Sequence, residues 1–166
     1  MKANMLDYLE ATAKRAPNRI AFYDDQESMT YVTLRDRSRR IGSCLAAIAV
    51  PCTPVALLLD SRSIRNIPAI FGTIYAGCAY APLDIAMPPE RLKLLLELLQ
   101  PSAVLMDERG EKAFAACGQA GFPAVNYDTA VTAETDDARL AAIRSQASMY
   151  DPMSILYTSG STGIPK

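Results

Sequence analysis

Hydrophobic positions in the first third of the chain recur at spacings that predict two helices joined through a short hairpin. Apolar residues three to four positions apart predict a helix from about Met5 to Ala16, which ends before Pro17. Two short β-prone runs, Ile20 to Tyr23 and Met29 to Tyr31, flank a polar stretch and predict a hairpin. A longer helix is expected next, with the Thr30 hydroxyl as its N-cap.

This second helix has one apolar face and one strongly basic face. The predicted apolar face consists of Leu34, Ser38, Ile41, Leu45 and Ile48. The basic face carries Arg35, Arg37, Arg39 and Arg40. As a group these arginines could bind an anion, but a solvated helix surface explains them better.

From residue 55 onward, strand-like apolar runs alternate with helical segments. The expected strands are Val55 to Leu59, Ala103 to Met106, Ala124 to Tyr127 and Ser154 to Tyr157. The expected helices are Ser63 to Tyr75, one from Pro88 that closes before Pro101, Glu111 to Cys117, and a turn near Ala138 to Arg144. The alternation predicts an α/β fold: a layered domain with a mostly parallel sheet flanked by helices.

Composition narrows the chemistry that the chain can carry out. Its 166 residues suit one domain or a piece of a larger one. The absence of histidine excludes Ser-His-Asp and Cys-His nucleophiles and His-ligated zinc within this chain. The net charge of −1 gives no pull toward nucleic acid or membrane, and neither is expected as a partner.

The cysteines and the chain's apolar stretches favour a soluble, cytoplasmic protein. Cys44, Cys52, Cys78 and Cys117 form no C-x-x-C pair, which argues against a zinc ribbon or a thioredoxin-type site. All four lie in apolar stretches and are predicted to be buried and reduced. Prolines interrupt both long uncharged stretches, 41–59 and 66–83, and the N-terminus lacks the apolar core of a signal peptide.

The candidate chemistry is concentrated in the last dozen residues, where a short apolar run leads into a loop rich in Gly, Ser and Thr. Its two glycines permit positive φ and let backbone N–H groups converge on one point, which forms an anion-binding concavity. Four hydroxyls can donate to phosphate oxygens, and a terminal lysine adds a positive charge. The residues predicted to bind phosphate are Thr158, Ser159, Gly160, Ser161, Thr162, Gly163 and Lys166.

This loop does not match the G-x-x-x-x-G-K-[ST] signature of P-loop proteins. Counted from Gly160, the sixth residue is Pro165 rather than glycine, and no Ser or Thr follows Lys166. Composition alone therefore leaves a phosphate site and a flexible linker or surface loop as equal alternatives.

Three ordered blocks carry a resemblance to a known family. The string YTSGSTGIPK at 157–166 closely resembles the phosphate-loop signature of the adenylate-forming (AMP-binding) enzymes. The segments Thr30 to Leu34, Ala76 to Asp84 and Met87 to Leu92 resemble two earlier blocks of that family. The family includes nonribosomal peptide synthetase adenylation domains, D-alanine–carrier-protein ligases and acyl-CoA synthetases. The A-Y-x-P-L-D block points to the aminoacyl-activating branch.

The sequence departs from the family pattern at a few positions. Thr33 stands where the family usually has Glu, so the reciprocal capping-box contact at the start of the second helix is expected to be lost or weakened. Tyr80, Pro82 and Asp84, within the second block, are interpreted as a tight loop between helix and sheet rather than as ligand contacts.

The resemblance implies an ATP-dependent ligase that activates an amino acid or other carboxylate as an acyl-adenylate and releases pyrophosphate. ATP with Mg²⁺ would be a substrate, and the acyl group would pass to a phosphopantetheine thiol on a carrier protein. Residues 1–166 would form a partial N-terminal subdomain of the large domain, ending at the phosphate-binding loop. The family's catalytic and metal-binding residues would follow Lys166, so none is assigned here and the chain alone is expected to be inactive.

Two other hypotheses remain open at this point. The chain could be a nucleotide- or phosphate-binding module without catalysis, or an interaction protein in which the loop has no ligand. An exposed apolar face would not separate them, because a partial enzyme would expose such a face as well.

Overall fold

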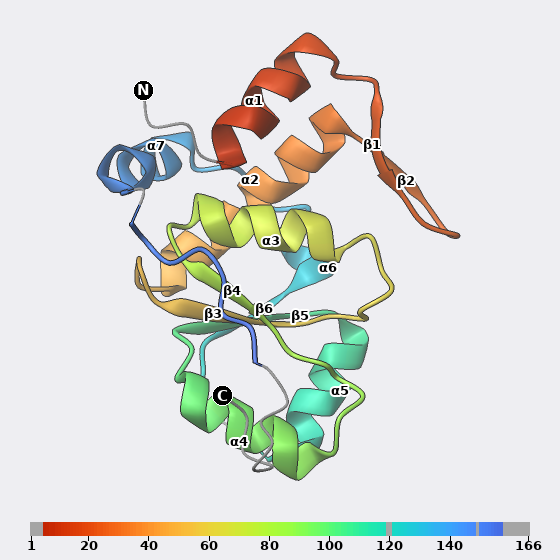
Figure 1. The fold of residues 1–166 in the computed structure, drawn as a ribbon, viewed down its shortest axis with the longest axis vertical. Coiled ribbons are helices and arrows are strands. Elements are labelled where there is room, and N and C mark those ends of the chain that lie inside the picture. Colours follow the sequence, from red (N-terminus) through yellow and green to blue (C-terminus); the bar gives the residue numbers. More distant parts are fainter. Residues whose placement is uncertain (1–4, 119–120, 149, 158–166) are drawn as a thin grey trace.

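The computed structural model describes residues 5–118, 121–148 and 150–157. A four-stranded parallel sheet in the order β4-β3-β5-β6 forms the centre of the molecule. Its strands are β3 (Pro54–Leu58), β4 (Ala79–Pro82), β5 (Ala103–Met106) and β6 (Ala124–Asn126). Figure 1 shows helices on both faces of this sheet. The expected α/β fold, with a mostly parallel sheet flanked by helices, is confirmed.

Two helix layers cover the sheet. On one face lie α4 (Pro89–Leu99) and α5 (Glu108–Ala116), and on the other lie α2 (Tyr31–Ile48), α3 (Asn66–Tyr75) and α6 (Tyr127–Ala130) (Figure 1). The helices α1 (Met5–Arg15) and α7 (Asp137–Gln146) pack outside, against α2 and α3. Within the described residues, no helix is long and apolar enough to cross a membrane.

The central strand β3 is buried on both faces, as its uninterrupted apolar run predicts. Val55 and Leu57 point into the core beneath α2 and α3. Ala56 and Leu58 point into the core beneath α4 and α5. Because successive side chains of β3 point to opposite faces of the sheet, this one strand contributes residues to both hydrophobic cores.

Two glycines allow α2 and α3 to pack in close contact. A Cβ on Gly42 would lie 2.6 Å from the Cβ of Tyr75, and a Cβ on Gly72 would lie 2.6 Å from Cγ2 of Ile41. Neither position has room for a side chain, which explains the presence of glycine inside two helices where it is otherwise unfavourable.

The hairpin and the cap of α2 follow the sequence prediction with one correction. Strand β1 (Ile20–Tyr23) pairs antiparallel with β2 (Ser28–Thr30). The Thr30 hydroxyl accepts a hydrogen bond from the Thr33 N–H at 3.3 Å. The Thr33 hydroxyl lies 2.9 Å from the Thr30 hydroxyl, so the side-chain contact expected to be lost is replaced by a hydroxyl pair.

The four arginines of α2 do not form a free anion-binding cluster. Arg35 pairs with Asp36, and Arg37 pairs with Glu27 from the hairpin. Arg39 pairs with Glu10 and Asp137, and Arg40 donates to the Val131 carbonyl. The basic face therefore ties α2 to neighbouring elements.

Several predicted boundaries and burials were wrong. Ile48, placed on the apolar face of α2, is 40% exposed because it ends the helix beyond the core. The third helix begins at Asn66 rather than Ser63, since turns occupy the residues before it. Cysteine burial was predicted for all four thiols, but Cys44 is half-buried and Cys52 is exposed in the turn before β3.

Candidate functional site

The predicted phosphate-binding residues Thr158, Ser159, Gly160, Ser161, Thr162, Gly163 and Lys166 lie outside the described residues. Their roles therefore stay predictions. The structure does describe the segment that leads into them, residues 150–157, and the sheet edge beside that segment.

The segment before the loop adds to the sheet beside β4. The Tyr80 N–H donates to the Met153 carbonyl at 3.0 Å, and the Ile155 N–H donates to the Tyr80 carbonyl at 2.9 Å. The two chains run parallel at this bridge between Tyr80 and Ser154. A strand was predicted at 154–157, and a single parallel bridge is what forms. Because the segment is parallel to β4, it leads toward the carboxyl edge of the sheet, where α/β proteins bind ligands.

Side chains of this segment alternate between the core and the solvent. Ile155 and Tyr157 pack against the core beneath α4 and α5. Leu156, between them, is 64% exposed. Burial raises the pKa of the Tyr157 phenol above its ordinary value, which agrees with its packing against the core. Tyr157 thus anchors the segment immediately before the candidate loop.

At the carboxyl edge an aspartate follows each of three neighbouring strands: Asp60 after β3, Asp84 after β4 and Asp107 after β5. Asp107 accepts hydrogen bonds from the Gly110 N–H at 2.8 Å and the Asp60 N–H at 3.0 Å. Asp84 accepts from the Ala86 N–H at 2.9 Å. Asp60 pairs with Arg109 at 2.5 Å. The Asp84 carboxylate therefore organises its own loop, whereas Asp60 and Asp107 connect the loop after β3 to the start of α5.

The start of α5 also depends on a feature that hydrophobic periodicity could not reveal. Asp107 caps this helix, which begins at Glu108 rather than at the predicted Glu111. A Cβ on Gly110 would lie 1.9 Å from the Leu58 carbonyl oxygen, so the first turn of α5 lies directly against the end of β3. An Asp three residues before a Gly was the available sequence signal.

These carboxylates do not form a metal centre. Among the described residues, no group of three or more His, Cys, Asp or Glu side chains is placed to hold a metal ion. The aspartates at the edge already bind backbone N–H groups or arginine. Any Mg²⁺ that accompanies a nucleotide would have to be bound by other groups.

A groove of about 450 Å³ lies beside this edge, between the loop after β4 and helix α5. Its lining is mostly apolar and consists of Ile85, Ala86, Met87, Pro89, Leu92, Arg109, Lys112, Ala113 and Ala116. The two cations on its rim are neutralised by pairs, Arg109 with Asp60 and Lys112 with Glu108. Ile85 and Met87 of the groove and Tyr157 of the segment that leads into the candidate loop pack against the same hydrophobic core.

The interpretation of Tyr80, Pro82 and Asp84 as one tight loop was wrong for the first two. Tyr80 and Pro82 belong to β4, where Pro82 pairs with Leu57. Proline is tolerated there because β4 is at the edge of the four-stranded sheet and the neighbouring Leu83 N–H, not the Pro82 nitrogen, donates to Leu57 of β3. Only Asp84 lies in the loop, and its hydrogen bond to Ala86 supports a role in loop structure.

Comparison with known proteins decides the family. A model of the family described as AMP-binding enzyme matches residues 9–166. The chain belongs to the AMP-binding enzyme family. The nonribosomal peptide synthetase sirP from Leptosphaeria maculans is 32% identical over 156 residues, which cover 90% of this chain and 7% of that protein. The chain thus spans a small part of the curated relatives it matches.

Solved structures of the AMP-binding family have the same fold. The fatty acyl-adenylate ligase from L. pneumophila, in complex with acyl adenylate and pyrophosphate, matches with a TM-score of 0.70 and 26% identity. That match covers 97% of this chain and 29% of the ligase. The AMPPNP-bound nonribosomal peptide synthetase FmoA3 matches with a TM-score of 0.74 and 28% identity, over 91% of this chain and 16% of the synthetase.

Proposed function

We propose that this chain is the N-terminal part of an ATP-dependent ligase that joins a carboxylate to ATP, forming an acyl-adenylate and releasing pyrophosphate. An amino acid is the favoured substrate class, because the A-Y-x-P-L-D block resembles the aminoacyl-activating branch. The observation that supports the proposal most is the parallel bridge between Ser154 and Tyr80. Through this bridge the described segment that precedes Thr158 runs toward the carboxyl edge of the sheet, the edge at which α/β proteins bind ligands.

In this proposal the loop stabilises the negative charge that builds up on the leaving diphosphate. Backbone N–H groups freed by Gly160 and Gly163 would donate to phosphate oxygens, together with the neighbouring hydroxyls. Lys166 would add a full positive charge. Hydrogen bonds to a charged acceptor contribute about 1.5–3 kcal/mol each, so a few of them suffice to position a polyphosphate.

The proposal also concerns Mg²⁺ and the group that accepts the acyl product. The aspartates at the carboxyl edge do not fit a Mg²⁺ site, so we assign no step to the metal through the described residues. A synthetase relative and a synthetase structure support transfer of the acyl group to a phosphopantetheine thiol on a carrier protein. On the same grounds we propose that residues 1–166 are one partial subdomain, inactive alone.

Pyrophosphate–ATP exchange tests both parts of this proposal. The 166-residue chain is expected to show no carboxylate-dependent exchange. A chain extended to the full length of its AMP-binding domain is expected to exchange in the presence of amino acids. Exchange by the short chain would refute its inactivity, and no exchange by the folded extended chain with any amino acid or other carboxylate would refute the ligase assignment.

Calorimetry with ATP and with pyrophosphate separates the ligase from a binding module. The short chain is expected to bind both weakly, because a loop at a chain terminus gains little from preorganisation. Tight binding that Lys166→Ala abolishes, together with an inactive extended chain, would favour a module that holds nucleotide without catalysis.

A further inference from the structure

Two cysteines lie on neighbouring segments at the amino edge of the sheet, opposite the edge toward which residues 153–157 lead. Cys52 lies in the turn before β3, and Cys78 immediately precedes β4. Cys52 is exposed, whereas Cys78 is 3% exposed. The pair thus combines one thiol open to solvent with one enclosed by the core.

Backbone hydrogen bonds place both members of this pair next to each other. The Cys52 N–H donates to the Gly77 carbonyl at 2.7 Å, and the Ala79 N–H donates to the Thr53 carbonyl at 3.1 Å. The two residues that flank Cys78, Gly77 and Ala79, are therefore hydrogen-bonded to Cys52 and Thr53. Cys52 and Thr53 together lie opposite Cys78, which is the two-against-one arrangement of a β-bulge. Residues so placed on neighbouring strands have Cα atoms about 5–6 Å apart, within the span of a disulfide.

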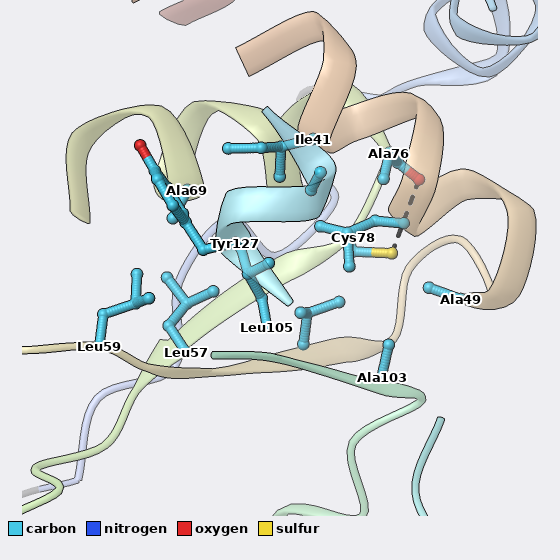
Figure 2. Packing of buried hydrophobic residues seen from close by; sticks show 13 residues of the cluster. Ile41, Ala49, Leu57, Leu59, Ala69, Ala76, Cys78, Ala103, Leu105 and Tyr127 are labelled. Carbon is cyan, nitrogen blue, oxygen red and sulfur yellow. Dashed lines mark hydrogen bonds between the residues drawn. The ribbon is translucent and has the colours of Figure 1, made fainter. Parts of the chain in front are cut away.

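The Cys78 sulfur points onto the turn that holds Cys52. This sulfur lies 3.4 Å from the Val50 carbonyl oxygen, a hydrogen-bond acceptor for the thiol. The Ala76 carbonyl oxygen, at 3.6 Å, is a second acceptor (Figure 2). Val50 and Thr53 hydrogen-bond to each other and close the turn around Cys52. Burial raises the pKa of Cys78 to about 11, and the charge of a Cys52 thiolate adds to that rise.

The turn that contains Cys52 can change its conformation so that the Cys52 sulfur moves toward Cys78. Cys52 has φ of 62°, in the left-handed region that non-glycine residues rarely adopt. The left-handed backbone at this position is strained by about 1 kcal/mol or more. Because a change of conformation would release this strain, its net free-energy cost is small. Pro51 and Pro54 confine the adjustment to the two residues between them.

We propose that Cys52 and Cys78 form an oxidisable dithiol that closes to a disulfide on exposure to hydrogen peroxide. Peroxide oxidises the Cys52 thiol to a sulfenic acid, and the O–O bond breaks with release of one water. The Cys78 sulfur then attacks the sulfenic sulfur. The S–S bond forms as the S–O bond breaks, and the hydroxyl leaves with the Cys78 proton as a second water.

This inference is independent of the proposed ligase function, because the amino edge is opposite the edge toward which residues 153–157 lead. Thiol counting and mass spectrometry on the 166-residue chain test it. After peroxide treatment the wild type is expected to lose two of its four thiols and a mass of two hydrogen atoms. Digestion is expected to yield one linked peptide pair containing Cys52 and Cys78, released by dithiothreitol.

Matched variants show which sulfur is attacked first. Cys52→Ser, an exposed and conservative change, is expected to keep its three thiols under the same treatment. Cys78→Ala is expected to stop at a sulfenic acid on Cys52, trapped by dimedone. Cys44→Ser and Cys117→Ser are the controls, and each is expected to form the same linked pair. Four retained thiols in the wild type, or a link between any other two cysteines, would overturn the proposal.

Discussion

At the carboxyl edge of the parallel sheet, the strands lead into polar loops and helix N-termini. At the amino edge, tight and mostly apolar turns lead into the strands. Asp60, Asp84 and Asp107 each bind backbone N–H groups or a cation at the carboxyl edge. At the amino edge, Cys52 and Cys78 lie where a turn meets β4. One sheet therefore separates the polar chemistry expected of a nucleotide site from a thiol pair.

The contrast follows from chain direction. The carboxyl ends of parallel strands must turn into helix N-termini, whose free N–H groups need acceptors such as the carboxylate of Asp107. The amino ends receive the chain from helix C-termini through short connections, such as the one in which Gly77 has φ of 73°. Polar side chains accordingly cluster at the carboxyl edge. Substitutions at the two edges test how much the stability of the fold depends on the side chains at each.

The largest effect is expected for Gly110→Ala, at the carboxyl edge. The new Cβ would meet the Leu58 carbonyl, so the free energy of unfolding should fall by about 3 kcal/mol in a urea titration. The matched control is Gly118→Ala, whose Cβ meets nothing within 4 Å. Its φ of 65° should cost only about 1 kcal/mol. Equal losses in the two variants would contradict the close packing of α5 on β3.

Asp107→Ala is expected to lower the free energy of unfolding by about 2 kcal/mol, because one buried and one partly buried N–H group lose their acceptor. The comparison is Asp136→Ala, which removes the exposed N-cap of α7 and should cost about 1 kcal/mol. Chemical denaturation of both variants measures the difference. A smaller loss for Asp107→Ala than for Asp136→Ala would show that the carboxyl edge does not depend on this carboxylate.

At the amino edge, stability should depend on pH through Cys78. Burial raises the pKa of this thiol to about 11 in the folded chain, so the unfolded chain loses its proton first as pH rises. The stabilisation is full below the unfolded pKa and disappears as pH rises through the folded value. The wild type under reducing conditions should lose about 2 kcal/mol more than Cys78→Ala across this window. Parallel pH profiles for the two proteins would contradict the buried thiol.

The smallest effect concerns the segment that leads to the candidate loop. Ile155→Ala should destabilise the chain by about 1 kcal/mol, because Ile155 is partly buried against the core. Leu156→Ala should change the stability by less than about 0.5 kcal/mol, since Leu156 is 64% exposed. Thermal denaturation of both variants measures these two changes in stability. The opposite ranking would place the segment in the other register relative to β4.

Local patterns in the sequence predicted the elements that have a regular apolar pattern of their own. The helix expected from Pro88 and the strand expected at Val55 to Leu59 both form, and β3 is buried on both faces as its apolar run predicts. The Thr30 cap was predicted as well, because an N-cap is a local interaction.

The errors fall where tertiary contacts override a local pattern. Pro82 favoured a loop, but β4 is at the edge of the four-stranded sheet, and its pairing with β3 needs no N–H donor from that residue. Cys52 stands in an apolar stretch but lies in a strained surface turn, so it is exposed. The close approach of Gly110 to Leu58 depends on how α5 packs on the sheet, which no local spacing shows.

The central claim is that the loop after Tyr157 holds the polyphosphate of ATP, and one substitution tests it directly. Pyrophosphate–ATP exchange should be measured on the extended AMP-binding domain carrying Lys166→Ala, with Lys112→Ala as the control. Loss of one charged contact should lower kcat/KM for ATP about 100-fold. The ion-paired and exposed Lys112 should be dispensable. Unchanged exchange in a folded Lys166→Ala variant would contradict the claim.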